Sequence, residues 1–488
     1  MSDLDYDVII IGLGPTGGVL ANLIAKHNLS IKILEKENQL YNLPRAVHFD
    51  DEIMRVFETI GISKNFLKQT IINKGTRFID EKNNLLLDWP RPKIITENGW
   101  YPSYRFHQPD LERNLRKKLL DYNKVSISQN SDVFQIQNKT NHVEVFFKNT
   151  KTKKDNVLAS KYVVGCDGAR SFVKGVINSN LEDLGFEQKW AVIDVLLKNK
   201  KTQLPDRTIQ YCSSTRPATY CRNVGRRRRW EIALKNEKDE EEFLKDKNLW
   251  NFLNRWVSKK DIEIERKAVY KFQSAIAKKW SRGRVFLAGD AAHLSPPFMG
   301  QGMCAGIRDV SNLAWKISKC LRIKHDEKFL NTYQSERFSN VREYIETTMR
   351  MGEFVNAVES IQITDNISSE ADGTKSMQSI KPKLGNGLGK RNDKIRGKIF
   401  PQFKLYSGKY LDIVYSKKPV LLYSPGIKKN ISNKIISIKS SKVNGLSNYF
   451  KKFKSKAIIV RPDRFILASL SLNESFDDFL KRNINFLI

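Results

Sequence analysis

The fold is decided near the start of the chain by the run Val8-Ile9-Ile10-Ile11-Gly12-Leu13-Gly14-Pro15-Thr16-Gly17. Its first four residues are all β-branched, which predicts a strand buried on both faces. Apolar residues through Ile24 predict a helix after the glycine turn, and Ile31–Leu34 predicts a second strand that ends at Glu35. The order strand, glycine turn, helix, strand and acid predicts an α/β unit that binds a dinucleotide.

Each glycine of this turn has a separate task in such a unit. Gly12 permits the tight turn, Gly14 lets the backbone approach a pyrophosphate, and Gly17 lets helix and strand pack closely. The start of the helix offers free N–H groups and a partial positive charge to phosphates. The carboxylate of Glu35 can accept hydrogen bonds from ribose hydroxyls. The cofactor-binding residues predicted here are Gly12, Gly14, Pro15, Thr16, Gly17, Glu35 and Lys36.

A second glycine-acid motif favours FAD over NAD as the dinucleotide. Residues 284–288 predict another buried strand, and Gly289-Asp290-Ala291-Ala292-His293 follows it. Asp290 is placed to bind the ribityl chain of an extended FAD. Gly300, Gly302 and Met303 open the next helix, so their backbone N–H groups can reach the edge of the isoalloxazine ring and stabilise negative charge there.

The remaining chain predicts further helices, strands and a domain boundary. A Gly-, Lys- and Asn-rich connector at 366–398 has no apolar period, and it predicts the boundary to a last domain with short strands and a terminal helix. The predicted helices are Asp51–Ile60, 109–120, 238–257, 304–321 and 329–358, and the predicted strands include 190–197, 230–234 and hairpins within 125–164.

Composition limits the function classes. The 488 residues are 40% hydrophobic and 28% charged, which is typical of a globular protein. The chain has no stretch of about 20 apolar residues for a membrane helix, and its acidic start predicts no export signal. The five cysteines form no C-x-x-C pair and no metal-ligand spacing, which predicts a reducing cytoplasm and no metal site.

The net charge of +32 raises the question of a nucleic-acid partner. Residues 381–488 carry 24 basic and 6 acidic residues, whereas residues 1–170 carry 25 and 20. No zinc-finger, RNP-type or helix-turn-helix motif accompanies the charge, so we interpret it as a solvated basic surface. The run Arg226–Arg229 also suits a localisation or RNA-binding signal. Because Trp230-Glu231-Ile232 follows directly, we favour a structural strand.

Several segments together resemble the class A FAD-dependent aromatic hydroxylases of the para-hydroxybenzoate hydroxylase superfamily, most closely the 3-(3-hydroxyphenyl)propionate hydroxylases. The resemblance covers about 1–360. It implies a Rossmann-like FAD domain (1–75, 100–180 and 276–365), an inserted β-sheet substrate domain (76–99 and 181–275), a linker (366–398) and a short thioredoxin-like domain (399–488). The segments that carry it are Pro44-Arg45-Ala46-Val47, Asp50-Asp51-Glu52, Phe106-His107-Gln108-Pro109, Gly165-Cys166-Asp167-Gly168, the 283–293 segment, Tyr333-Gln334-Ser335-Glu336-Arg337 and Val460-Arg461-Pro462-Asp463-Arg464.

Residue roles carry over by position within this resemblance. Arg45 would contact the flavin pyrophosphate and receive the nicotinamide cofactor, and Gln108 would bind FAD. Asp167 would lie where FAD and the pyridine nucleotide meet, and Pro297 would lie beside the reacting flavin edge. Two further candidates have equally plain alternatives: His48 faces flavin or substrate, or is a polar loop residue, and Tyr211 hydrogen-bonds a phenol, or only packs in a strand.

The resemblance implies an FAD- and NAD(P)H-dependent monooxygenase of aromatic catabolism. It would hydroxylate a phenolic substrate, such as a hydroxyphenylpropionate-like acid, with O₂ through a flavin hydroperoxide. The sequence does not choose between NADH and NADPH, and it leaves a homodimer open. A polyketide- or ubiquinone-pathway hydroxylase is the alternative, and a flavin-bearing nucleic-acid-binding protein is a more distant one. The absence of C-x-x-C excludes dithiol chemistry in the last domain.

Overall fold

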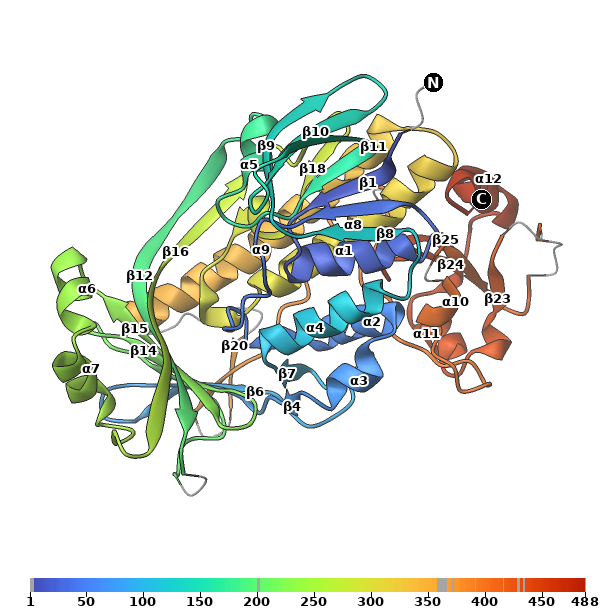
Figure 1. Cartoon of the computed structure of the whole chain (residues 1–488). Helices are drawn as coiled ribbons and strands as arrows, with labels where there is room; N and C mark the ends of the chain where they lie inside the picture. Colours follow the sequence, from blue (N-terminus) through green and yellow to red (C-terminus); the bar gives the residue numbers. More distant parts are fainter. Residues whose placement is uncertain are drawn as a thin grey trace.

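The computed structural model describes residues 4–199, 202–357, 367–370, 373–390, 392–415, 417–427, 431–432 and 435–487. Three regions follow one another across the molecule: a C-terminal region (red), a central region built on an eight-stranded sheet, and a ten-stranded sheet at the far end (Figure 1). This confirms the predicted fold class, an α/β nucleotide-binding region with a β-sheet region inserted and a small domain at the C-terminus.

The central sheet contains the predicted nucleotide-binding unit. Its order is β17-β18-β11-β1-β2-β8, and β10 and β9 extend it from β11. β1 is parallel to both β11 and β2, so the carboxyl ends of these strands meet at one edge, where α/β proteins bind ligands. The strands are β1 (Tyr6–Ile11), β2 (Ile31–Leu34), β8 (Val125–Ser128), β9 (Ser131–Asn138), β10 (Val143–Asn149), β11 (Asp155–Gly165), β17 (Ser281–Arg282) and β18 (Val285–Leu287).

Helices pack around this sheet and share one apolar core with it. The helix at Asp51–Ile60 has the bounds that the sequence predicts, because each end has a defined cap. The Asp50 carboxylate accepts a hydrogen bond from the N–H of Ile53, and Gly61 ends the helix at φ +83°. The helices of this region are α1 (Pro15–Ala25), α2 (Asp51–Ile60), α3 (Ser63–Leu67), α4 (Gln108–Leu119), α5 (Phe172–Val176), α8 (Gly302–Arg322) and α9 (Glu327–Ala357).

The ten-stranded sheet has the order β19-β16-β12-β15-β14-β13-β5-β6-β21-β20. Two helices cover one of its faces with an apolar cluster, where the sequence predicts a single helix over 238–257. That prediction is wrong because Lys245 adopts an extended backbone and ends the first helix. The elements are β5 (Gly75–Ile79), β6 (Leu85–Pro90), β12 (Leu181–Leu197), β13 (Thr208–Tyr211), β14 (Ala218–Arg222), β15 (Arg227–Leu234), β16 (Ile262–Ala277), β19 (His293–Leu294), α6 (Glu237–Phe243) and α7 (Asp246–Leu253).

The segment that the sequence predicts as a linker contributes to this sheet. Strands β20 (Ile367–Ser369) and β21 (Lys375–Met377) form an antiparallel pair, and β21 lies beside β6. Leu384 and Leu388, further along the same segment, are buried. The first residue of the predicted linker, 366, and the last of the predicted helix, 358, lie outside the described residues.

A small three-stranded sheet connects the central region to the ten-stranded sheet. β7 (Ser103–Arg105) lies between β3 (His48–Asp50) and β4 (Ile71–Ile72) and is antiparallel to each of them. In this sheet His48 is paired directly with Arg105. Both side chains are buried, so the sheet places two titratable groups between the two larger sheets.

The C-terminal region is a mixed four-stranded sheet with helices, in the order β23-β22-β24-β25. β22 is parallel to β23 and antiparallel to β24, which forms a hairpin with β25. That this region is a thioredoxin-like domain stays a prediction. Within the described residues, the helices of this protein lack the length and apolarity that crossing a membrane requires. The elements are α10 (Asp412–Tyr415), β22 (Val420–Tyr423), β23 (Ser437–Lys439), α11 (Leu446–Lys452), β24 (Ser455–Val460), β25 (Ile466–Ser471) and α12 (Phe476–Leu487).

Candidate active site

The glycine turn between β1 and α1 is closed by packing at two positions and open at the third. A Cβ at Gly12 would lie 2.5 Å from the carbonyl oxygen of Cys166, and a Cβ at Gly17 would lie 2.1 Å from the carbonyl oxygen of Gly12. A Cβ at Gly14 would meet no protein atom within 4 Å. Gly14 is also the N-cap of α1, and no side chain caps that helix. The first N–H groups of α1 are therefore left for a phosphate.

The acid that follows β2 lies over the same turn. One carboxylate oxygen of Glu35 accepts a hydrogen bond from the N–H of Leu13 at 2.7 Å, and the other accepts from Glu37 at 2.9 Å. Glu35 thus stabilises the turn, and its carboxylate can still accept further hydrogen bonds there. Lys36, which the sequence predicts as a cofactor contact, is exposed and forms an ion pair with Asp132 at 3.0 Å.

The glycine turn and the second glycine-acid motif meet at the side chain of Thr16. A Cβ at Gly289 would lie 2.7 Å from the Thr16 hydroxyl oxygen, and a Cβ at Gly306 in α8 would lie 2.5 Å from it. Only glycine at these two positions leaves room for Thr16. The start of α1, the motif after β18 and helix α8 therefore lie in direct contact, although 290 residues separate Thr16 from Gly306.

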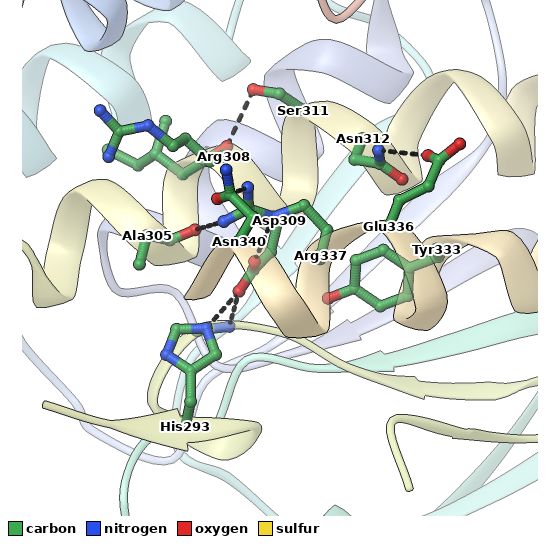
Figure 2. A network of polar contacts seen from close by, with 12 residues as sticks. His293, Ala305, Arg308, Asp309, Ser311, Asn312, Tyr333, Glu336, Arg337 and Asn340 are labelled. Carbon is green, nitrogen blue, oxygen red and sulfur yellow. Dashed lines mark hydrogen bonds and ion pairs between the residues drawn. The ribbon is translucent and has the colours of Figure 1, made fainter. Parts of the chain in front are cut away.

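A buried polar network fixes the second motif in place. Asp309 of α8 accepts hydrogen bonds from the N–H of Gly289 at 3.1 Å, from His293 at 2.6 Å and from Arg337 at 2.9 Å (Figure 2). Burial acts to raise the pKa of Asp309, but His293 and Arg337 outweigh it and lower the pKa below its ordinary value. The Asp309 carboxylate is therefore ionised, and it binds the loop of the second motif at Gly289 and at His293, on either side of Asp290. Sequence reasoning missed Asp309, since an acid inside a predicted helix has no distinguishing pattern.

Asp290 is the free acid of this motif. It lies in a short 3-10 helix (Gly289–Ala291), and its side chain is exposed. The surrounding protein still raises the pKa of its carboxyl by desolvation, against the opposing charges of His293 and Arg45. Arg45 therefore lies near enough to Asp290 for their opposite charges to interact. A carboxylate that reaches solvent can accept a hydrogen bond from a hydroxyl group of a ligand, which is the role that the sequence predicts for Asp290.

The loop that opens α8 lies against His48. A 3-10 turn (Pro297–Met299) leads to Gly300 at φ +65°, and the Gly300 carbonyl lies 3.4 Å from Nδ1 of His48. Burial, together with Arg105 and Arg91, lowers the pKa of His48 to about 3, so its ring is neutral at neutral pH. Pro297 is half-buried, and a Cβ at Gly302 would meet no protein atom within 4 Å. Met303 is half-buried at the start of the helix.

The loop around Arg45 is held by its backbone. Oε1 of Gln108, at the start of α4, accepts hydrogen bonds from the N–H groups of Arg45 at 3.2 Å and Ala46 at 2.7 Å. The Arg45 side chain is exposed and lies over the ring of Tyr41. Gln108 thus positions the backbone of Arg45. Its side-chain amide oxygen is already used by these two hydrogen bonds to the loop.

The ten-stranded sheet supports the same loop with a buried ion network. Arg229 donates to the carbonyl oxygens of Pro44 and Arg45, and Arg266 donates to that of Pro44 at 2.7 Å. Both arginines form ion pairs with Asp194, which is their direct neighbour on β12. This agrees with a structural role for the arginine run. Sequence reasoning missed Asp194 and Arg266 because their roles depend on strand register.

Two other predicted site residues have local partners. The Asp167 carboxylate accepts hydrogen bonds from Ser171 Oγ at 2.6 Å and the N–H of Val173 at 3.1 Å, at the start of α5. Tyr211 points away from the Pro297 loop: its ring packs on Trp256 in the apolar cluster beneath α6 and α7. Neighbouring strand residues face opposite sides of a sheet, so Gln210 faces the site and Tyr211 does not. This packing favours the structural alternative for Tyr211, in which its ring only packs in a strand.

These features fit an extended FAD. The N-terminus of α1 leaves N–H groups and open space at Gly14 for the pyrophosphate, and Asp290 offers a free carboxylate for the ribityl chain. The start of α8 leaves open space at Gly302 and has no side-chain cap, so its first backbone N–H groups would be available to the isoalloxazine ring. The loop at Phe298 then contacts the ten-stranded sheet, since its ring lies 5.5 Å from that of Trp190.

Known proteins with similar sequences are hydroxylases by name. The chain is 35% identical over 352 residues to "Probable NADH-specific resorcinol 4-hydroxylase" of Rhodococcus jostii (strain RHA1), covering 71% of this chain and 65% of that protein. It is 32% identical over 346 residues to "3-(3-hydroxy-phenyl)propionate/3-hydroxycinnamic acid hydroxylase 2" of Burkholderia vietnamiensis (strain G4 / LMG 22486), covering 71% and 62%. The chain thus matches under two thirds of each relative's length.

The fold is also shared beyond the matched region. The crystal structure of aklavinone-11 hydroxylase in a ternary complex with FAD and aklavinone superimposes with a TM-score of 0.80 at 16% identity, covering 100% of both chains. That likeness includes the C-terminal domain. The family described as "FAD binding domain" matches residues 5–348, which contain the glycine turn, Asp290 and the start of α8. The chain therefore belongs to this family of FAD-binding flavoproteins.

Proposed function

We propose that this protein is an FAD- and NAD(P)H-dependent monooxygenase that hydroxylates a phenolic aromatic substrate. One observation carries the proposal: the loop that opens α8 at Gly300 and Gly302, where the family's flavin would end, contacts His48 on one side and, through Phe298, Trp190 of the ten-stranded sheet. A planar aromatic molecule between that loop and the sheet would lie beside the flavin. The names of the two relatives support a phenol as the substrate class.

The chain's own residues bind, orient and exclude water. FAD, when bound, supplies the electron-transfer and oxygen-activating chemistry. The N–H groups at the start of α1 hold its pyrophosphate, and Asp290 accepts a ribityl hydroxyl. Asp309 fixes the loop that carries Asp290, with Gly289 donating to it. Phe298 and Met299 pack into an apolar cluster with Trp190, which keeps water from the reacting edge.

The position of Arg45 supports a role in receiving the pyridine nucleotide. Its exposed guanidinium lies near enough to Asp290 for their charges to interact, while its backbone is fixed by Gln108 and Arg229. An exposed guanidinium on a fixed loop suits a pyridine nucleotide whose phosphate binds and then leaves. We further propose a cytoplasmic location, supported by five unpaired cysteines. The homodimer, the catabolic role and the lack of a specific nucleic-acid partner stay predictions.

The test is turnover by the purified yellow protein with a panel of aromatic compounds. Resorcinol, 3-(3-hydroxyphenyl)propionate, a polyketide phenol and a ubiquinone-precursor phenol are each supplied with NADH or NADPH. We expect faster NAD(P)H oxidation with a simple phenol and one oxygen atom from ¹⁸O₂ in its product. A product from the polyketide or ubiquinone precursor alone would favour those alternatives. If labelled oxygen enters no aromatic product while the flavin turns over, the proposal is wrong.

A further inference from the structure

Arg105 is a buried arginine that has no acidic partner among the residues described by the structure. It ends strand β7, is 6% exposed, and donates one hydrogen bond, from Nη2 to the Thr208 hydroxyl on β13. Its Nε is buried and has no partner among the described residues. A guanidinium has five N–H donors, so most of the donor capacity of Arg105 is unused.

Several other buried arginines do have acidic partners. Arg308 binds Asp50 and Glu52, Arg337 binds Asp309, and Arg229 binds Asp194. Over the described ranges, Arg105 forms no ion pair. Arg464 likewise donates only to a hydroxyl, Thr59 at 3.3 Å, but it lies at the interface with the C-terminal domain, within the field of Asp412.

Nearby charges leave the Arg105 site positive. Glu231 is the acid that acts most on Arg105, but it already lies 3.5 Å from Arg229. Arg222 and Arg229 act on Arg105 in the opposite direction, and burial lowers its pKa from the ordinary value. Because an unpaired buried charge is costly, this arrangement calls for an anion from outside the chain.

Strands β13 and β14 of the ten-stranded sheet present polar side chains toward Arg105. Thr208 and Gln210 on β13 and Thr219 on β14 point to the side of Arg105, and Gln210 accepts a hydrogen bond from Thr219. The alternate residues, Ile209 and Tyr220, pack in the apolar cluster on the other side. Arg105 therefore faces hydrogen-bonding groups rather than a packed apolar core.

The position of Arg105 ties it to the flavin end of the site. Its direct partner across the small sheet is His48, and Nδ1 of His48 lies 3.4 Å from the carbonyl oxygen of Gly300 at the start of α8. Resting on the function proposed above, we propose that Arg105 binds an oxyanion of the aromatic substrate, either its phenolate or a side-chain carboxylate, and so determines how the ring faces the flavin.

Either oxyanion gives Arg105 a defined task. A guanidinium beside the phenol oxygen favours the phenolate, which makes the ring richer in electrons. A guanidinium beside a carboxylate fixes the opposite end of the molecule by a two-pronged contact. In both cases Arg105→Lys keeps the charge and loses the fork, whereas Arg105→Met loses both.

Titration calorimetry on the FAD-loaded protein separates the two sources. The probes are resorcinol, which has only phenol oxygens, 3-phenylpropionate, which has only a carboxylate, and 3-(3-hydroxyphenyl)propionate, which has both. We expect Arg105→Met to weaken at least one single-group probe and the combined probe about 10-fold or more, and Arg105→Lys to restore part of the affinity. The single-group probe that loses affinity identifies the oxyanion.

Arg228→Met is the matched control. Arg228 lies on β15 of the ten-stranded sheet and, like Arg105, is buried. It donates to the carbonyl oxygens of Gly225 and Arg227. We expect its removal to leave the affinity of all probes unchanged. In ligand-free protein, Arg105→Met should keep or raise the unfolding temperature, since it removes an unpaired buried charge; a merely structural Arg105 would lower it.

Failure of this inference differs from failure of the proposed function. If Arg105→Met binds every probe as the wild type does, or if the wild type binds none, Arg105 is not the anion site, even where hydroxylation occurs. If binding depends on Arg105 but no labelled oxygen enters a product, the inference stands and the hydroxylase proposal is wrong.

Discussion

At the scale of single residues, two buried acids near the site hold the structure, whereas Asp290 reaches solvent. Asp194 and Asp309 are buried and form ion pairs with arginines, whereas Asp290 is exposed on the loop that Asp309 of α8 holds through the N–H of Gly289. The sequence motif marks Asp290 because it follows a predicted strand with a glycine before it. It cannot mark Asp309, whose partners His293 and Arg337 come together only after α8 and α9 have packed.

Asp290→Ala should weaken FAD binding about 10-fold or more. The change removes a carboxylate that accepts a hydrogen bond from the ribityl chain, and a hydrogen bond to a charged group is worth about 1.5–3 kcal/mol. Reconstitution of apoprotein with FAD, followed by flavin fluorescence, gives the two dissociation constants. Asp155→Ala removes an exposed acid of β11 and should leave the affinity unchanged. Equal affinity in wild type and Asp290→Ala would contradict the assignment.

At the scale of elements, local patterns predict the bounds of β2 and α2, while pairing between distant strands stays hidden. Ile31–Leu34 and Asp51–Ile60 follow from apolar period and caps. The contact of Asp194 with both arginines follows from its register opposite each of them in β15 and β16. No local pattern gives that register, so the support of the Arg45 loop could not be predicted from a single sequence.

The glycines of the first turn allow a test that separates ligand binding from packing. Gly14→Ala adds a methyl group where no protein atom lies within 4 Å, so the apoprotein should keep its unfolding temperature while FAD affinity falls. Gly17→Ala places the methyl group 2.1 Å from the Gly12 carbonyl oxygen, which should destabilise the apoprotein by about 1–3 kcal/mol. Thermal unfolding of both apoproteins and FAD titration provide the readouts. A destabilised Gly14→Ala with normal FAD binding would reverse this interpretation.

At the scale of the whole molecule, the C-terminal domain is joined to the FAD-binding region by buried ions. Arg461 of the domain binds both carboxylate oxygens of Glu336 in α9 at 2.8 Å, and Lys316 of α8 binds the same group at 2.8 Å. On the other side, Arg55 of α2 binds Asp412 at 2.8 Å. The Arg-Pro-Asp motif therefore serves as a contact between domains, which agrees with a thioredoxin-like domain that has no dithiol.

This junction should make domain docking sensitive to acid. Burial acts to raise the pKa of Glu336, but Arg461 and Lys316 outweigh it and lower the pKa far below the ordinary 4.5. Its contribution is therefore complete above about pH 4.5 and is lost as the pH falls from there toward the folded pKa. Glu336→Gln should cost about 3–5 kcal/mol at pH 7, since it leaves buried cations unpaired.

The measurement compares wild type and Glu336→Gln by thermal unfolding and by limited proteolysis near residue 390, from pH 7 to pH 3. We expect the variant to unfold earlier and to be cleaved faster at pH 7. The difference should shrink below pH 4.5, because Glu336 takes up a proton in the unfolded wild type while the folded carboxylate stays ionised. Glu346→Gln, on the same helix but exposed and 3.6 Å from Arg342, should change stability by no more than about 1 kcal/mol at any pH. A difference between wild type and Glu336→Gln that stays constant down to pH 3 would show that the ionised carboxylate does not hold the domains together.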